Sequence, residues 1–206
     1  MILLACAVAA ETAFCSDLSD VERLVTGVGP VEAACVVTAA LASRSYRLVV
    51  NAGIGGAFEG CAPVGAGAVV SDDAMELDLE SGAPLALPPG IELVDRVNSD
   101  PTLVARVAAA GFPVLRGITV ARVTSSEATA RRLAHERGAQ VESMEGFAVL
   151  RAASLAGVPA IQLRGISNRC GDRERSGWDF RAGVEGLRAI VNAFFELPGV
   201  RTESRR

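Results

Sequence analysis

The sequence predicts an α/β protein in which a β-sheet is sandwiched between helices. The chain has 206 residues, of which 50% are hydrophobic and 21% charged, the size and balance of one globular domain. Apolar runs with the character of strands alternate repeatedly with segments of helical character. The apolar run over residues 47–51 is typical of a strand buried on both faces. We therefore expect a single domain over residues 1–198 and a frayed, charged tail over 199–206.

In the first half of the chain, the expected strands are residues 3–9, 22–26, 47–51 and 64–71. A helix over 31–42 follows the turn Gly27-Val28-Gly29, because Pro30 suits the first position of a helix. That turn is not a dinucleotide fingerprint, since Glu32 stands where the third glycine should be. The acidic segment 72–89 is predicted to be a loop that serves as a lid or as a contact between subunits.

The second half continues the alternation. We expect helices over 101–110, 127–136, 145–156 and 184–197, with strands over 113–123, 140–142 and 159–166. Nothing in the sequence repeats, and no composition change marks a linker.

The apolar N-terminus leaves an export signal open as an alternative, because Leu4-Ala5-Cys6 has the look of a lipoprotein signal. However, no positive residue precedes the apolar run, and Glu11 interrupts it after ten residues. A buried first strand fits better. Without 18 uninterrupted apolar residues, no segment is expected to span a membrane.

The composition excludes several mechanisms. All 20 basic residues are Arg, so chemistry that needs a lysine is impossible, and the single imidazole is His135. His135 lies in an arginine-rich segment typical of a solvated helix end, so we place it outside any site. The five cysteines have no ligand spacing, which indicates reduced thiols in the cytoplasm. We expect no metal and no cofactor, and the net charge of −4 argues against nucleic acid as a partner.

Polar residues gather where the predicted strands end. Glu11 follows the first strand, Glu142 and Glu145 flank a strand-to-helix junction, and Arg164 and Asn168 end a later strand. Each of them alone could be a helix cap or a solvated end. The glycine-rich segment 51–56 is expected to form a loop at the same edge, where open α/β sheets bind ligands. Their convergence at this edge predicts a ligand site.

Taken together, these segments resemble the purine nucleoside phosphorylase and nucleosidase superfamily over nearly the whole chain. The resemblance is carried by Glu11 and by the segments 51–56, 69–72, 141–146 and 164–168. Ser143 and the Ser167-Asn168 pair are most similar to the nucleosidases of bacterial menaquinone biosynthesis. The resemblance implies a three-layer α/β/α sandwich with a central twisted mixed β-sheet, nucleoside phosphorylase-like, in a homodimer or higher homo-oligomer.

The resemblance also implies roles, because cleavage of a nucleoside bond passes through a cationic, oxocarbenium-like ribosyl group. Glu145 would accept hydrogen bonds from the ribose 2′ and 3′ hydroxyls, with Met144 packing beneath the sugar. Glu11 would deprotonate the attacking water, and Arg164 would lie beside that water. The other expected substrate-binding residues near the sugar and base are Ile54, Gly55, Gly56, Glu142 and Ser167.

Asn168 favours a 6-oxopurine base, hypoxanthine or guanine. Its NH₂ can donate to the 6-oxo group while its carbonyl accepts the proton on N7, whereas adenine-specific relatives carry Asp at this position. An amide is no general acid, so the source of the N7 proton stays open.

Hydrolysis is favoured over phosphorolysis, because no Arg precedes Arg23 and the Glu11 carboxylate would repel phosphate. The substrate implied by the resemblance carries a carboxyphenyl group, for which we expect aromatic and cationic partners after Asn168. The candidates are Arg169, Arg173, Arg175, Trp178, Phe180 and Arg181, unless this segment is an exposed turn with internal ion pairs. Three alternatives remain: a purine nucleoside phosphorylase, an adenine-preferring nucleosidase and a non-catalytic purine-nucleoside sensor.

Overall fold

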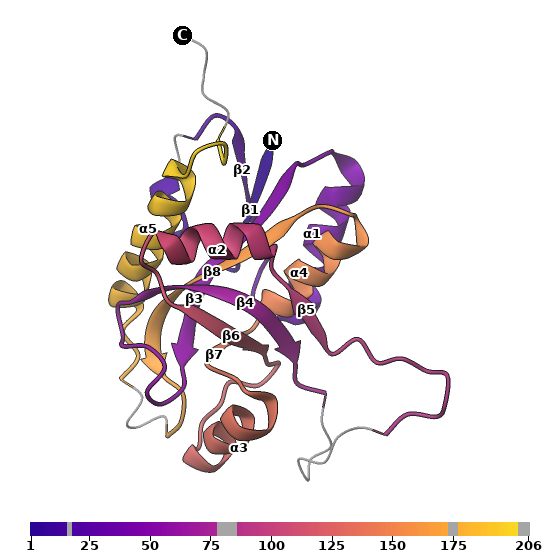
Figure 1. Ribbon diagram of the computed structural model, residues 1–206, viewed down its shortest axis with the longest axis vertical. Helices are drawn as coiled ribbons and strands as arrows, with labels where there is room; N and C mark the ends of the chain where they lie inside the picture. Colours follow the sequence, from indigo (N-terminus) through magenta and orange to yellow (C-terminus); the bar gives the residue numbers. More distant parts are fainter. Residues whose placement is uncertain (16–17, 78–85, 173–176, 202–206) are drawn as a thin grey trace.

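The computed structural model describes residues 1–15, 18–77, 86–172 and 177–201, and within them helices surround a β-sheet (Figure 1). The strands are β1 (Ile2–Cys6), β2 (Val21–Val25), β3 (Leu48–Ala57), β4 (Gly67–Met75), β5 (Arg96–Asn98), β6 (Val114–Thr119), β7 (Val141–Ser143) and β8 (Ala160–Arg169). The helices are α1 (Pro30–Ser43), α2 (Pro101–Ala109), α3 (Glu127–Arg137), α4 (Gly146–Leu155) and α5 (Phe180–Glu196), besides the short 3₁₀ turns η1 (Ala9–Glu11) and η2 (Ala13–Cys15). The predicted α/β class is confirmed.

The sheet is mixed, as predicted. Its strand order is β2-β1-β3-β7-β6-β4-β5, and β8 pairs with both β3 and β4. Strands β1, β2, β3 and β8 run parallel, whereas β7 is antiparallel to β3, and β4 is antiparallel to β5 and β8. Because β8 joins β3 to β4, five strands pair in a closed ring, in the order β3, β7, β6, β4 and β8. The parallel pairing of β1, β3 and β8 also brings the ends of these three strands together.

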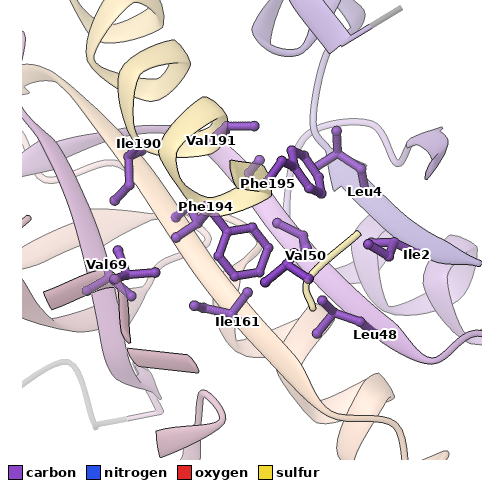
Figure 2. Packing of buried hydrophobic residues seen from close by; sticks show 14 of the residues in the cluster. Ile2, Leu4, Leu48, Val50, Val69, Ile161, Ile190, Val191, Phe194 and Phe195 are labelled. Atoms are coloured by element: carbon purple, nitrogen blue, oxygen red, sulfur yellow. The ribbon is translucent and has the colours of Figure 1, made fainter. Parts of the chain in front are cut away.

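The period-2 alternation of strands sends apolar side chains to both faces of the sheet. Ile2 and Leu4 of β1 face the layer of α2 and α5, whereas Leu3 faces the layer of α1 and α4. The side chains of Phe194 and its neighbours on α5 pack onto this face of β1, β3, β4 and β8 (Figure 2). Truncating a buried Phe of this kind to Ala costs about 3–5 kcal/mol. This packing holds the strand ends at fixed positions.

Four predicted boundaries at or near the site are wrong. The segment 51–56 is not a loop, because β3 continues to Ala57 beside β8, which satisfies its backbone. Strand β8 extends past residue 166, so Ser167 and Asn168 lie within the strand. Residues 72–75 belong to β4 rather than to a loop, since they pair with β5 and β6. The first strand ends at Cys6, and residues 9–11 form the turn η1 instead.

Other differences are smaller. Strand β5 was not predicted, and α5 starts at Phe180 because the Asp179 carboxylate caps the backbone N–H of Ala182. Residues 199–201 do not form the predicted frayed tail. Val200 is buried in the core, and its carbonyl accepts a hydrogen bond from Arg47. Residues 78–85 of the segment expected to form a lid lie outside the described residues. Among the described residues, no helix has the length and apolar character needed to cross a membrane.

Candidate active site

A cavity of about 600 Å³ opens at the ends of β1, β3 and β8, where β7 leads into α4. Ten of the predicted site residues line it: Glu11, Ile54, Gly55, Gly56, Glu142, Met144, Glu145, Ser167, Asn168 and Trp178. They come from five separate stretches of the chain. The predicted convergence on one end of the sheet is therefore what the structure shows.

Glu11 is held rigidly at the end of η1, with only 3% of its surface exposed. Its Oε2 accepts the backbone N–H groups of Ala7 (3.0 Å) and Val8 (3.1 Å), and its Oε1 accepts the N–H of Ile54 (2.8 Å). Burial raises the pKa of Glu11, and these hydrogen bonds and the nearby Arg164 charge oppose the rise. The result is a carboxylate of fixed orientation and increased basicity.

Arg164 lies behind the wall of the pocket and does not line it. The side chain is 1% exposed, and Nη2 donates to Oδ1 of Asn51 on the neighbouring strand β3. Gly53 makes room for this arrangement: a Cβ there would lie 2.5 Å from Nη1 of Arg164 and 2.9 Å from Oε1 of Glu11. Arg164 and Glu11 therefore approach each other at Gly53, and the Arg164 charge favours the ionised carboxylate.

Glu145 presents its carboxylate from the junction between β7 and α4. Its Oε1 accepts the backbone N–H of Gly29 at 2.9 Å, across 116 residues of sequence. The chain can turn that N–H toward Glu145 because Gly29 adopts a φ of 102°, which favours glycine. The turn Gly27-Val28-Gly29 thus has a role at the site that its sequence did not reveal, and Val28 lines the cavity.

Asn168 lies on β8 with its amide fixed at both ends. Its Oδ1 accepts a hydrogen bond from Oγ of Ser167 at 2.9 Å, and its Nδ2 donates to the carbonyl of Arg169 at 3.1 Å. Gly56 on β3 leaves the space for this side chain, since a Cβ there would lie 2.8 Å from Nδ2. Gly53 and Gly56 of β3 are therefore required by side chains that approach from β8.

Glu142 forms part of the wall, but its carboxylate is already occupied. Its Oε1 accepts the N–H of Thr124 at 3.0 Å, and its Oε2 accepts the Thr124 hydroxyl. Burial raises the pKa of Glu142, and the two bonds from Thr124 oppose that rise. Its backbone carbonyl also lies so close to β3 that a Cβ at Gly55 would come within 2.7 Å of it.

Two aromatic rings stand at the other end of the cavity. Trp178 and Phe180 contact each other edge to face, with centroids 6.4 Å apart, and 67% of Trp178 is exposed. Arg169 points elsewhere, because it pairs with Glu127 and with Glu59. The predicted Arg173 and Arg175 lie outside the described residues, and His135 is exposed on α3, as predicted.

Sequence reasoning missed part of the lining. The missed residues are Ala7, Val8, Val123, Thr124, Ser143 as a wall residue, and Gly177. Most are small or apolar and carry no motif, so no signal in the sequence could have found them. Among the described residues, the lining holds three carboxylates and no cationic side chain, and no group of three metal-ligating side chains occurs.

The fold and this carboxylate-lined pocket define a member of the Phosphorylase superfamily, whose family model matches residues 20–196. Within it, the chain belongs to the futalosine hydrolase family. It is 38% identical to the futalosine hydrolase of Streptomyces coelicolor over 189 residues, which cover 87% of this chain and 79% of that protein. It is 33% identical to the futalosine hydrolase of Thermus thermophilus over 188 residues, covering 86% and 83% of the two chains.

The native structure of futalosine hydrolase from Helicobacter pylori has the same fold. It superposes with a TM-score of 0.79 at 14% identity, covering 94% of this chain and 96% of that one. The resemblance predicted from the motifs is thus confirmed.

Proposed function

We propose that this protein hydrolyses the N-glycosidic bond of futalosine and releases hypoxanthine and dehypoxanthine futalosine. The observation that carries the proposal is the charge of the pocket, where Glu11, Glu142 and Glu145 stand without a lining cation among the described residues. A ribosyl group that becomes cationic in the transition state is stabilised by such carboxylates. Phosphate, the co-substrate of a phosphorylase, would be repelled by them.

Glu11 is proposed as the general base that activates water. Three backbone N–H groups occupy three of the roughly four acceptor positions of its carboxylate, which leaves one for a water molecule. Burial makes this carboxylate more basic than one in solvent, which suits proton abstraction near neutral pH. Arg164 would act through Glu11, by holding the carboxylate in its ionised form.

Glu145 is proposed to bind the ribose. Gly29 occupies one of its oxygens, and the other is available to the 2′ and 3′ hydroxyls. Met144, which also lines the cavity, would pack beneath the sugar. Glu142 would shape the wall around the substrate rather than bind it through its carboxylate, because Thr124 already uses both oxygens.

Asn168 is proposed to select a 6-oxopurine. After its bonds to Ser167 and Arg169, the amide keeps one N–H and one carbonyl lone pair. These two groups are complementary to a 6-oxo oxygen and a protonated N7. A 6-amino group would place its N–H donors against the remaining N–H donor of Asn168. Two unpaired donors cost far more binding free energy than a missing apolar contact.

Trp178 and Phe180 are proposed to bind the carboxyphenyl group of the substrate. Both rings line the cavity and keep exposed surface, so a further aromatic ring could contact them in an offset or edge-to-face arrangement. We also propose a homodimer or higher homo-oligomer, since exposed Val28 and Val123 extend the apolar surface around the cavity.

Incubation of the purified protein with futalosine, and with inosine in the presence and absence of phosphate, tests the proposal. We expect phosphate-independent release of hypoxanthine from futalosine, measured by chromatography. Ribose 1-phosphate formation would instead establish a phosphorylase. Cleavage of 5′-methylthioadenosine in a parallel sample, with both hypoxanthine nucleosides left intact, would establish an adenine-specific nucleosidase. Glu145→Gln serves as a matched variant, because the Gln carbonyl can still accept the Gly29 N–H; we expect it to fold and to lose at least tenfold in kcat/KM.

A further inference from the structure

Helix α4 begins in an unusual way, because the residue at its N-cap does not cap it. Glu145 occupies the N-cap position, yet its carboxylate makes no hydrogen bond to the first turn and reaches Gly29 and the cavity instead. A helix start normally has N–H groups that a side chain at the N-cap satisfies. In α4 these donors need another partner if Glu145 is to remain available to a substrate.

Thr119, at the end of β6, supplies that partner. Its Oγ1 accepts the backbone N–H of Phe147 at 2.8 Å and donates its own proton to Oδ1 of Asp73 at 2.7 Å. Both side chains are fully buried. A second donor of this turn, the N–H of Gly146, points to Oγ of Ser143 at 3.4 Å, a weaker contact. The cap of α4 is thus built from neighbouring strands.

Asp73 lies directly under the start of α4. Gly146 allows this approach, because a Cβ there would overlap Oδ2 of Asp73 and lie 2.5 Å from both amide atoms of Gln162. Gly117 is required on the other side, where a Cβ would lie 2.6 Å from the same oxygen. A carboxylate at a helix N-terminus also interacts favourably with the helix dipole. The site beneath α4 is therefore shaped around this one side chain.

We propose that Thr119, oriented by Asp73, is a positioning residue for Glu145. By capping α4 through Phe147, the pair leaves the Glu145 carboxylate free and fixes the backbone from which it projects. Neither residue lines the cavity, so both act through Glu145 and not on the substrate. The inference rests on the proposed function, in which Glu145 binds the ribose.

Two matched variants test the proposal. Thr119→Ser keeps the hydroxyl that accepts from Phe147 and donates to Asp73, whereas Thr119→Val keeps the shape and removes the hydroxyl. We expect Thr119→Val to lose about tenfold or more in kcat/KM for futalosine, and Thr119→Ser to retain activity within about threefold. Hydrogen–deuterium exchange of the peptide that contains Phe147 should accelerate in the Val variant only. Equal losses in the two variants would overturn the proposal.

A double-mutant cycle separates positioning from a general structural effect. In a Glu145→Gln background, measured with enzyme in excess so that slow turnover is detected, Thr119→Val should cost less than twofold further. A full additional tenfold loss would show that Thr119 does not act through Glu145. If the wild-type protein releases no hypoxanthine, the proposed function fails, whereas the exchange experiment still decides whether the Thr119 hydroxyl caps α4.

Discussion

Replacement of Asp73 by Asn should change how the stability of the protein depends on pH. Asp73 is completely buried in β4, and burial raises its pKa from 3.8 to about 6. The hydrogen bond from the Thr119 hydroxyl, the nearby Gln162 amide and the charge of Arg164 oppose this rise. Asn has nearly the same shape, and its carbonyl can still accept from Thr119, but it never ionises.

The magnitude follows from proton linkage. Between pH 3.8 and about 6, the folded protein binds the Asp73 proton more tightly than the unfolded chain does. The stability that this proton contributes is complete below pH 3.8 and is lost as the pH rises through 6. A shift of about two pKa units corresponds to about 3 kcal/mol over the whole window. Asp73→Asn escapes this loss, so its stability relative to wild type should improve by about 3 kcal/mol from acid to neutral pH.

Urea unfolding of both proteins at several pH values from 4 to 7.5 measures the effect. The difference between the two free energies of unfolding is the informative quantity, because the other buried carboxylates, Glu11 and Glu142, titrate in both proteins. We expect this difference to change by about 2 kcal/mol or more in favour of Asn over that range. Parallel pH profiles would refute the reasoning and show that Asp73 ionises normally.

Four further outcomes are expected. Glu11→Gln should lower kcat by roughly 10²–10⁴-fold, while calorimetry should still detect substrate binding. The variant should also unfold at a lower temperature, because the new amide nitrogen faces backbone N–H donors. Unchanged turnover would exclude Glu11 as the base. Asn168→Asp should raise the ratio of adenosine-type to inosine-type cleavage in competition assays, and an unchanged ratio would contradict the pairing argument. Gly53→Ala should lose activity and about 1–3 kcal/mol of stability in chemical denaturation, because its Cβ meets Arg164 and Glu11. His135→Ala should keep full activity and stability within about 0.5 kcal/mol, since the imidazole is exposed on α3.

The glycine-rich segment after the third strand shows where prediction from sequence succeeds and fails. Its position after a buried strand correctly placed Ile54, Gly55 and Gly56 at the cavity. The expected loop was wrong, because glycine commonly marks turns and only the long pairing with β8 keeps this segment in the sheet. Arg164 and Asn168 need the space at Gly53 and Gly56, and the Glu142 backbone needs it at Gly55, which no local pattern reveals.

Residues 72–75, where the acidic segment begins, show a prediction from sequence that failed. The acidic sequence predicts a loop over residues 72–89, which includes Asp73. The structure buries it completely, with the Thr119 hydroxyl as its hydrogen-bond partner and Gly146 at the start of α4 beside it. The groups that stabilise a buried carboxyl group such as that of Asp73 come from distant segments, so only the folded chain shows that this residue is buried.

The sequence by itself determined the α/β class, the order of the elements and the residue types at the strand ends, because hydrophobic periodicity and turn residues act locally. It also determined the family, through Glu11, Glu145 and Asn168 in their motifs. Only the tertiary structure decided which groups hold those residues in place. Gly29 binds Glu145 across 116 residues, and Arg164 on β8 supports Glu11 at the end of η1. Such partners are set by the pairing of strands far apart in the chain, and strand pairing is a property of the whole fold.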